Sequence, residues 1–353
     1  MCHMRATVLQ SPGVLAFLDL PEPVAREGQT ILHMRACGIC GSDLRYFAGD
    51  NPWARHTLGE MRPNPPNMVL GHEVAGVVPG PGGDRRCGVL AFRTCGRCRL
   101  CRTGRENLCP HTEHLGHGAG WEGYEYNPGG MAERLPVWTD NLYDLPGHIS
   151  YEEATLLDGL GVAVHAVRRS GLRAGDAALV LGGGPIGLLI LQVCKAFGAR
   201  QVALADVYAQ PLTVGEQLGA DLLLNTHEDD WRALTLSCTD GQGAEAVFET
   251  TGSTEVQAQA LGVVAKGGTL VLLAGAARGL TLDDSFLAGE RSLTTSSNNH
   301  YADYQTGLDL LISGQVIAGP IVTHVFPLRE VKHAFDVASH KEQHHALKVV
   351  LVP

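Results

Sequence analysis

The stretch Leu179-Val180-Leu181-Gly182-Gly183-Gly184-Pro185-Ile186-Gly187 decides the fold of this 353-residue chain. The apolar run AALVL leads into the glycines and the apolar run GLLILQVCKAFGA follows them, so the glycines join a strand to a helix. In such a turn Gly182 permits the tight bend, Gly184 lets a pyrophosphate approach the backbone, and Gly187 lets helix and strand pack closely. We interpret it as a dinucleotide-binding turn rather than a purely structural one, with Gly182, Gly184, Pro185, Ile186 and Gly187 as the binding residues.

A carboxylate lies where a dinucleotide site of this kind needs one. Asp206 stands nineteen residues after Gly187, at the end of the strand-like run QVALAD. There it can accept hydrogen bonds from the hydroxyls of the adenosine ribose. It would also repel a 2′-phosphate, and Val207, Tyr208 and Ala209 offer no cation to hold one. The sequence therefore favours NAD over NADP.

The rest of the chain predicts two domains, because 353 residues exceed one ordinary core. From about Arg5 to Arg134 short β-like runs alternate with turn residues, whereas from about Tyr151 strands alternate with helical spacers, which predicts a covered parallel sheet. The segment from about Ser296 onward returns to loops and short helices. We expect it to rejoin the first half, so that the parallel-sheet domain is inserted.

Charge and composition exclude several function classes. The chain has 27 Lys and Arg against 37 Asp and Glu, a net charge of −10, and no basic run. Nucleic acid and anionic membranes are therefore not expected partners. No apolar stretch near the N-terminus is long enough for a signal peptide, so we expect a cytoplasmic protein whose cysteines serve as metal ligands or free thiols rather than in disulfides.

Four cysteines form the clearest metal motif. Cys95, Cys98, Cys101 and Cys109 follow the spacing C-x2-C-x2-C-x7-C in CGRCRLCRTGRENLC. Four thiolates in so short a loop can close a tetrahedron round zinc and leave no position for substrate, which predicts a structural site. An iron–sulfur cluster is an alternative at similar spacings, and unliganded packed cysteines are another.

A second group of residues suggests an open metal site. Cys40 lies in ACGICGSDLRYFAG, and His72 and Glu73 follow in a GHE run about thirty residues later. One Cys, one His and one carboxylate, with a fourth position left for water or substrate, is the composition of a catalytic zinc site. Taken alone, a buried Cys and a hydrogen-bonded His also fit a purely structural role.

Together, the GICGSD run, the GHE run, the four-cysteine loop and the GGGPIG turn resemble, in order and spacing, the zinc-dependent medium-chain dehydrogenases. The resemblance is closest to the polyol, sorbitol and threonine dehydrogenase branch and spans nearly the whole chain. It implies an α/β fold with a GroES-like, mostly β catalytic domain at 1–155 and 298–353, and a Rossmann domain with a doubly wound parallel sheet at 156–297. It also implies a homodimer or homotetramer, with the strand in GGTLVLLAG as a candidate for pairing across subunits.

The same resemblance implies two zinc ions per chain and NAD. The catalytic ion would be held by Cys40 and His72, with Glu73 as a ligand or close neighbour and Asp158 as a further ligand. Of the residues around it, Ser42 would carry the substrate proton away and Asp43 would support the metal shell. One departure concerns the proton relay, because Arg45 stands where family members often have His. A guanidinium is a poor proton acceptor, so water or another histidine, with His114 and His117 as candidates, would have to replace it.

The implied activity is the interconversion of a secondary alcohol of polyol, sugar or cyclitol type and its ketone by hydride transfer. Two long segments are candidates for the substrate pocket or for plain surface loops, because they combine aromatic and polar residues; they carry Trp53, Trp121, Tyr124 and Tyr126. The run Ser297-Asn298-Asn299-His300 is a further candidate near the nicotinamide. The alternatives are a threonine or simple alcohol dehydrogenase, a non-redox member of the same scaffold, and a metal-binding interaction module.

Overall fold

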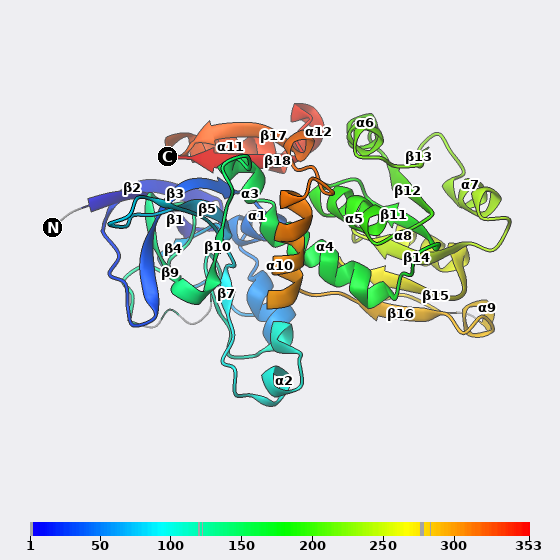
Figure 1. The fold of residues 1–353 in the computed structure, drawn as a ribbon, viewed down its shortest axis with the longest axis horizontal. Coiled ribbons are helices and arrows are strands. Elements are labelled where there is room, and N and C mark those ends of the chain that lie inside the picture. The colour runs from blue at the N-terminus through cyan, green and yellow to red at the C-terminus, as the bar shows by residue number, and fades with distance from the viewer. Residues whose placement is uncertain (1–2, 119–120, 122, 276–278, 283) are drawn as a thin grey trace. The chain divides into compact units, whose positions relative to one another are not determined.

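The computed structural model describes residues 3–118, 121, 123–275, 279–282 and 284–353 (Figure 1). Its contacts divide the chain into two units, Met1–Asp158 with Val322–Pro353, and Gly159–Ile321. We expected residues 298–321 in the first unit, but they lie in the second. The reason is α10 (Tyr301–Ile312), whose Asp303 accepts a hydrogen bond from His165 of α4 (Leu157–Ser170). Figure 1 shows the orange α10 beside the green α4.

The first unit is mostly β. It consists of β1 (His3–Ser11), β2 (Val14–Pro21), β3 (Gln29–Gly38), β4 (Met68–Val69), β5 (Glu73–Val78), β6 (Arg85–Val89), β7 (Phe92–Arg93), β8 (Glu113–His114), β9 (Arg134–Trp138), β10 (Leu142–Asp144), β17 (Val322–Pro327) and β18 (Lys348–Val352), with α1 (Gly41–Phe47), α2 (Arg99–Arg102), α3 (Tyr151–Ala154), α11 (Val331–Ser339) and α12 (Lys341–His344). The main sheet has the order β10-β6-β5-β3-β18-β17, with β9 also paired to β3.

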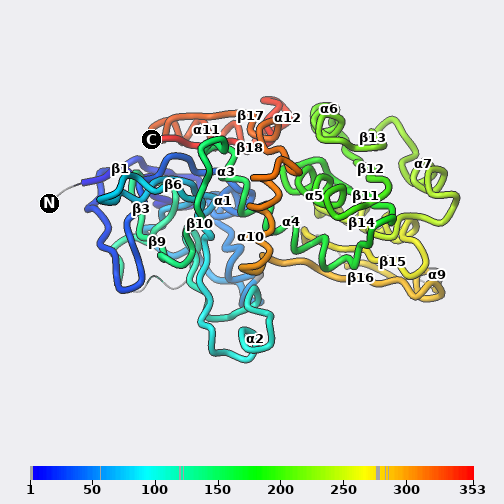
Figure 2. Tube along the Cα trace, viewed as in Figure 1, coloured from blue at the N-terminus to red at the C-terminus, as the bar shows by residue number. Residues whose placement is uncertain are grey.

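The C-terminal strand joins distant parts of the first unit. Val350 and Leu351 of β18 pair with Gly38 and Cys37 of β3, so the last strand of the chain, red in Figure 2, lies beside the blue strand β3. On its other edge, β3 pairs with β5, where Gly38 lies opposite Glu73. The C-terminal strand β18 and the GHE segment at the start of β5 therefore lie on either side of β3.

The second unit contains β11 (Ala177–Leu181), α5 (Pro185–Ala196), β12 (Gln201–Asp206), α6 (Ala209–Gln217), β13 (Leu222–Asn225), α7 (Trp231–Cys238), β14 (Ala244–Glu249), α8 (Thr254–Ala260), β15 (Val264–Leu272), α9 (Asp284–Leu287) and β16 (Ser292–Thr295), besides α4 and α10. Its strands are parallel in the order β13-β12-β11-β14-β15-β16. Every residue of β11 is buried, as a strand covered on both faces requires.

This strand order is that of the doubly wound dinucleotide-binding fold. The order reverses between β11 and β14, and the glycine turn follows β11 at that switch point. The predicted combination of a mostly β domain and a doubly wound parallel sheet is confirmed.

One strand expectation was wrong. The GGTLVLLAG strand is β15, which already pairs with β14 on one side and β16 on the other, so it has no edge to offer a second subunit. The edge strands of this sheet, among the described residues, are β13 and β16.

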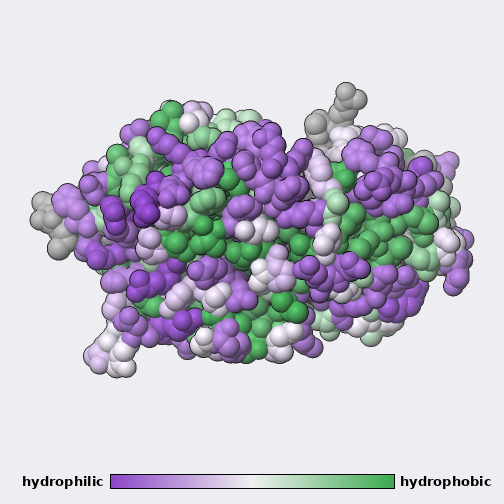
Figure 3. Space-filling view, turned by 90° about the horizontal axis from the view of Figure 1, so that it is seen from above, coloured by the Kyte–Doolittle hydropathy of each residue, from purple (hydrophilic) through white to green (hydrophobic). Residues whose placement is uncertain are grey.

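Among the described residues, no helix combines the length and apolar character that crossing a bilayer needs. On the face shown in Figure 3, hydrophilic side chains surround several smaller apolar areas, as is ordinary for a folded protein surface.

Candidate metal and cofactor sites

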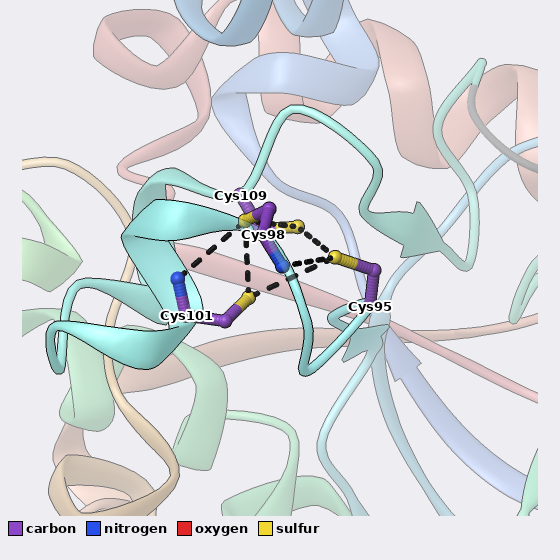
Figure 4. Close-up of side chains that lie close together, drawn as sticks. All are labelled: Cys95, Cys98, Cys101 and Cys109. Carbon is purple, nitrogen blue, oxygen red and sulfur yellow. Dashed lines mark hydrogen bonds between the residues drawn. The ribbon is translucent and has the colours of Figure 1, made fainter.

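The four cysteines of the predicted structural site converge in a lobe formed by α2 and its flanking loops (Figure 4). Their Sγ atoms are separated by 3.5 Å for Cys98 and Cys101, 3.6 Å for Cys95 and Cys109, 3.9 Å for Cys98 and Cys109, and 4.0 Å for Cys95 and Cys101. Four sulfurs bound tetrahedrally at about 2.3 Å from zinc lie about 3.8 Å apart. The lobe therefore has the dimensions of a closed zinc site.

Two further observations support this interpretation of the lobe. Backbone N–H groups of Arg97 and Cys98 lower the pKa of Cys95 to about 6, which favours the thiolate that a metal needs, whereas burial raises the pKa of Cys101. An iron–sulfur cluster would hold its cysteine sulfurs farther apart, because cluster atoms lie between them. The distances favour zinc over that alternative.

The second predicted group also converges. The ligand atoms of Cys40, His72 and Glu73 lie within 4.8 Å of one another. Cys40 caps the N-terminus of α1, while His72 and Glu73 lie where the chain enters β5. Ligand atoms around one tetrahedral zinc ion are about 3.3 to 3.8 Å apart, so small movements bring these three to a common ion.

Asp43 organises this group from a fully buried position. It accepts hydrogen bonds from the backbone N–H groups of Cys40, at 2.8 Å, and Gly71, at 3.1 Å. Its Oδ1 lies 3.8 Å from Nδ1 of His72, so Nδ1 faces the carboxylate and Nε2 is the nitrogen left for a metal. Asp43 thus connects the segment that carries Cys40 to the segment that carries His72.

The electrostatics of the group favour a cation. Burial lowers the pKa of His72, but the charges of Cys40 and Asp43 outweigh burial and raise it well above its ordinary value. Ser42, the predicted proton carrier, has a buried Oγ with no hydrogen-bond partner among the described residues. The site thus combines excess negative charge with an unpaired hydroxyl.

Glu73 has a buried partner that was not predicted from the sequence. Lys348, on β18, places Nζ 2.7 Å from each carboxylate oxygen of Glu73, and both side chains are almost fully buried. Gly38, between them on β3, makes this possible, because a Cβ there would lie 2.1 Å from Oε2 of Glu73. A lysine inside the otherwise apolar run ALKVVLV was the only available signal.

The structure places the remaining predicted residues differently. Asp158 does not belong to the compact Cys40–His72–Glu73 group, although its charge acts on His72; burial raises the pKa of Asp158 to about 6. Arg45, on α1, forms an ion pair with Asp50, which follows the helix, at 2.6 Å. The expected proton relay therefore does not run through position 45.

The two candidate histidines lie close to the metal group. The ring centroid of His117 is 4.7 Å from that of His72 and 4.2 Å from that of His114. Nδ1 of His117 lies 3.2 Å from the hydroxyl of Tyr46. Burial lowers the pKa of His114 to about 3, so this ring stays neutral.

The aromatic residues considered for substrate binding separate into two groups. Tyr124 and Tyr126 line a cavity of about 330 Å³ together with residues of β1 and β2, and none of the predicted site residues lines that cavity. Trp121 stacks on Trp138 at 5.1 Å and donates Nε1–H to the carbonyl of His114. Tyr124 and Tyr126 thus do not face the predicted metal site.

In the second unit, the glycine turn has the expected geometry. Gly182 has φ +103°, and a Cβ on Gly187 would lie 1.8 Å from the carbonyl oxygen of Gly182. Gly184 caps α5, and Pro185 is its first residue. No atom lies within 4 Å of the place where a Cβ on Gly184 would stand, which leaves the approach of a pyrophosphate open.

Asp206 is held beside this turn. Its carboxylate accepts hydrogen bonds from the backbone N–H of Gly183, at 2.6 Å, and of Tyr208, at 2.9 Å. The glycine motif and the carboxylate nineteen residues later therefore belong to one constellation.

A third cluster, His165, His300 and Asp303, has metal-like spacing. The carboxylate of Asp303, however, already forms an ion pair with Arg168 and accepts hydrogen bonds from His165, at 2.9 Å, and the backbone N–H of His300, at 2.9 Å. Hydrogen bonds account for this cluster, which joins α4 to the segment before α10.

Comparison with known proteins agrees with both units. Residues 26–147 match the alcohol dehydrogenase GroES-like domain, and residues 185–313 match the family described as zinc-binding dehydrogenase. D-arabitol-phosphate dehydrogenase of Enterococcus avium is 30% identical, covering 94% of each chain, and L-threonine 3-dehydrogenase of Bacillus velezensis is 30% identical, covering 99% of each. The crystal structure of 2R,3R-butanediol dehydrogenase from Bacillus subtilis superposes with a TM-score of 0.84 at 26% identity, covering 99% of each chain.

Proposed function

We propose that this chain, which belongs to the zinc-binding alcohol dehydrogenase family, interconverts a secondary alcohol of polyol, sugar or cyclitol type and its ketone. As a member of that family it is an oxidoreductase that uses zinc and a nicotinamide dinucleotide. The observation that carries the proposal is the convergence of the ligand atoms of Cys40, His72 and Glu73 within 4.8 Å of one another. Two residues after Cys40, the buried Oγ of Ser42 has no hydrogen-bond partner among the described residues.

We assign the catalytic zinc to Cys40, His72 and Glu73, and the structural zinc to Cys95, Cys98, Cys101 and Cys109. When bound, zinc acts as a Lewis acid towards the substrate oxygen, and the nicotinamide accepts the hydride. Asp158, which the family resemblance suggests as a further ligand, is an alternative carboxylate for this ion. Its charge acts on His72, which supports a place close to the ion.

The residues around the ion have separate tasks. Ser42 supplies a buried hydroxyl that can accept the substrate proton in a hydrogen bond. Asp43 orients His72 and anchors the backbone of Cys40 and Gly71. Lys348 balances the charge of Glu73 and so keeps a second anion in a buried site that already contains a thiolate.

We assign NAD rather than NADP to the second unit. The support is the carboxylate of Asp206 beside Gly183, together with Val207 and Tyr208, which are partly exposed and carry no positive charge. A 2′-phosphate there would meet an anion and no cation. The ratio of kcat/KM with NAD to kcat/KM with NADP tests this assignment. We expect the value with NAD to be the larger, and a preference for NADP would contradict the assignment.

The exposed edge of the parallel sheet supports the expected homodimer or homotetramer. Among the described residues, β16 pairs with β15 alone, and Leu293 within β16 is 37% exposed. An edge strand with an exposed apolar side chain is suited to pairing with a second copy. We place the subunit contact there.

A single assay tests the proposed function. NADH formation is followed by absorbance over a panel of polyols, inositols, aminocyclitols, sugars, threonine and simple alcohols, with Cys40→Ser as the matched variant. We expect turnover of at least one polyhydroxylated substrate and a loss of about 1,000-fold or more in Cys40→Ser, because the Lewis acid loses an anionic ligand. Turnover of threonine alone would favour the amino alcohol alternative, which the threonine dehydrogenase relative supports. No turnover of any substrate would refute the proposal.

A further inference from the structure

We propose that Asp336, His344 and His324 bind a divalent transition-metal ion of the zinc class, at a third site separate from the two zinc sites described above. The three residues come from α11, α12 and β17 of the first unit. None of them belongs to the predicted catalytic or structural group, so the inference goes beyond the proposed function.

Histidine is concentrated near the C-terminal end of the chain. Five of the 16 histidines lie between residues 324 and 345, namely His324, His333, His340, His344 and His345. Imidazole nitrogens are ligands that zinc, nickel and copper ions prefer, whereas magnesium and calcium ions prefer oxygen. The carboxylate of Asp336 lies within the same run. The composition of this segment therefore suits a transition metal.

The chain bends so that His344 returns to Asp336. The two residues are eight apart, which in a straight helix would separate them by about 12 Å along the axis. His340, between α11 and α12, has φ −111° and ψ 50°, outside the helical range, and beyond this bend Nε2 of His344 lies 3.8 Å from Oδ2 of Asp336. That distance is too long for a hydrogen bond. It is close to the separation of about 3.3 Å between a nitrogen and an oxygen that share one zinc ion.

His340 holds the other oxygen of the same carboxylate. Its Nδ1 lies 3.0 Å from Oδ1 of Asp336 and 3.0 Å from the backbone carbonyl of Asp336. Both oxygens are acceptors, so Nδ1 carries the hydrogen and donates it. A hydrogen bond to one oxygen orients a carboxylate that binds a metal through the other. His340 is thus a positioning residue that leaves Oδ2 of Asp336 to the ion.

His324 supplies a third ligand from the neighbouring strand. Burial lowers the pKa of His324 and the charge of His344 lowers it further, so the two rings lie within electrostatic range of each other. Nδ1 of His324 lies 3.0 Å from Oγ1 of Thr323, and that hydroxyl donates its only hydrogen to the carbonyl of Lys348, at 3.2 Å. The ring must therefore donate to Thr323 through Nδ1. Nε2 of His324 is left with the lone pair that a metal needs.

The three side chains are open to an ion from solution. The side chain of Asp336 is 54% exposed and that of His344 is 33% exposed, while His324 is half-buried. Exposed side chains can rotate, which lets the three ligand atoms close on one ion, with water in the remaining position. A solvent-open site holds its ion less tightly than a closed four-cysteine site. We therefore expect the third ion to exchange while the other two stay bound.

The test is a titration of the zinc-loaded full chain, desalted to its tightly bound ions, with Zn²⁺ and separately with Mg²⁺ by calorimetry. The proteins are wild type, His344→Gln, Asp336→Asn, His340→Gln and the control His227→Gln, which changes an exposed histidine of the second unit. We expect wild type and control to bind one further Zn²⁺ per chain and no Mg²⁺. His344→Gln and Asp336→Asn should each weaken the third Zn²⁺ by more than about 100-fold, and His340→Gln by about 10-fold, as for a residue that only orients a ligand.

A second readout identifies the nitrogen ligands. Cu²⁺ is added in place of the third Zn²⁺ and followed by electron paramagnetic resonance, where bound imidazoles produce nitrogen hyperfine coupling. We expect coupling to two imidazoles in wild type and to one in His324→Gln. Coupling that is unchanged in His324→Gln would overturn the place of His324 in the ligand set.

Two calorimetric results would overturn the site itself. One is a wild type that binds no further Zn²⁺, and the other is a third Zn²⁺ that His344→Gln and Asp336→Asn leave unchanged. These measurements do not depend on turnover. A wild type that oxidises no alcohol but binds the third ion through His344 would contradict the proposed function and support the inference.

Discussion

Replacing Lys348 by Met tests whether this lysine stabilises the buried carboxylate of Glu73 in the predicted catalytic site. At 2.7 Å the attraction between Lys348 and Glu73 is about 6 kcal/mol at an effective dielectric constant of 20, and much of it is offset by the cost of burying both ions. Removing the lysine leaves a buried carboxylate alone, which typically costs about 3 to 5 kcal/mol. For a unit of about 190 residues, this corresponds to a fall in Tm of about 10 °C.

Metal content turns this stability measurement into a test of ligation. If Glu73 binds zinc, the ion replaces Lys348 as its counter-charge, so we expect Lys348→Met to lose at least about twice as much stability in chelator-treated protein as in zinc-loaded protein. The double variant Lys348→Met, Glu73→Gln should recover most of the loss in metal-free protein, because it removes the unpaired charge. Scanning calorimetry of wild type, Lys348→Met and the double variant, each with and without zinc, measures these differences.

Two results would refute the reasoning about Lys348. A loss below about 1 kcal/mol in metal-free Lys348→Met would show that the ion pair does not stabilise the buried carboxylate. An equal loss with and without zinc would show that Glu73 does not meet the ion, and Asp158 would then be the third ligand.

Four further predictions follow from other parts of the chain. Cys98→Ser should lower the metal content from two zinc ions per chain to one, and an unchanged count by plasma emission spectrometry would rule out the cysteine lobe as a zinc site. Gly187→Ala should abolish NADH binding measured by fluorescence, because its Cβ would lie 1.8 Å from the Gly182 carbonyl, and normal binding would contradict the proposed turn. Burial alone would raise the pKa of Asp303, but His165, His300 and Arg168 lower it. The ionised carboxylate therefore stabilises the fold above about pH 4, and this stabilisation is lost as the pH falls through the lowered pKa. Asp303→Asn should have a smaller free energy of unfolding in urea than wild type at pH 7, and the difference should narrow below about pH 4 rather than stay constant. Leu293→Lys should reduce the mass found by light scattering if β16 forms the subunit contact, and an oligomer of unchanged mass would exclude that contact.

Features encoded by local spacing were the easiest to predict from the sequence. The glycine turn, Asp206 and the four-cysteine loop each lie within a short stretch, so the residues that must meet are already close along the chain. The structure brings Asp206 to the turn and the four sulfurs to within 4.0 Å of their neighbours. The alternation of strands and helices likewise sufficed to predict the parallel sheet.

Features that depend on pairing between distant segments could not be predicted. Lys348 meets Glu73 only because β18 and β5 both pair with β3, and because Gly38 leaves room between them. His117 reaches His72 only because Gly116 fits against Gly71. The boundary near residue 298 was placed too early because hydrogen bonds between α4 and α10, which no sequence pattern reveals, hold residues 298–321 in the second unit.

The most direct test of the account is a zinc titration of the metal-free protein with NAD and the best polyol of the panel, followed through NADH formation. The account predicts almost no NADH without metal and a rate that rises until two zinc ions per chain are bound, with Cys40→Ser saturating at one ion and staying inactive. NADH formation that does not depend on zinc, or full activity in Cys40→Ser, would contradict it.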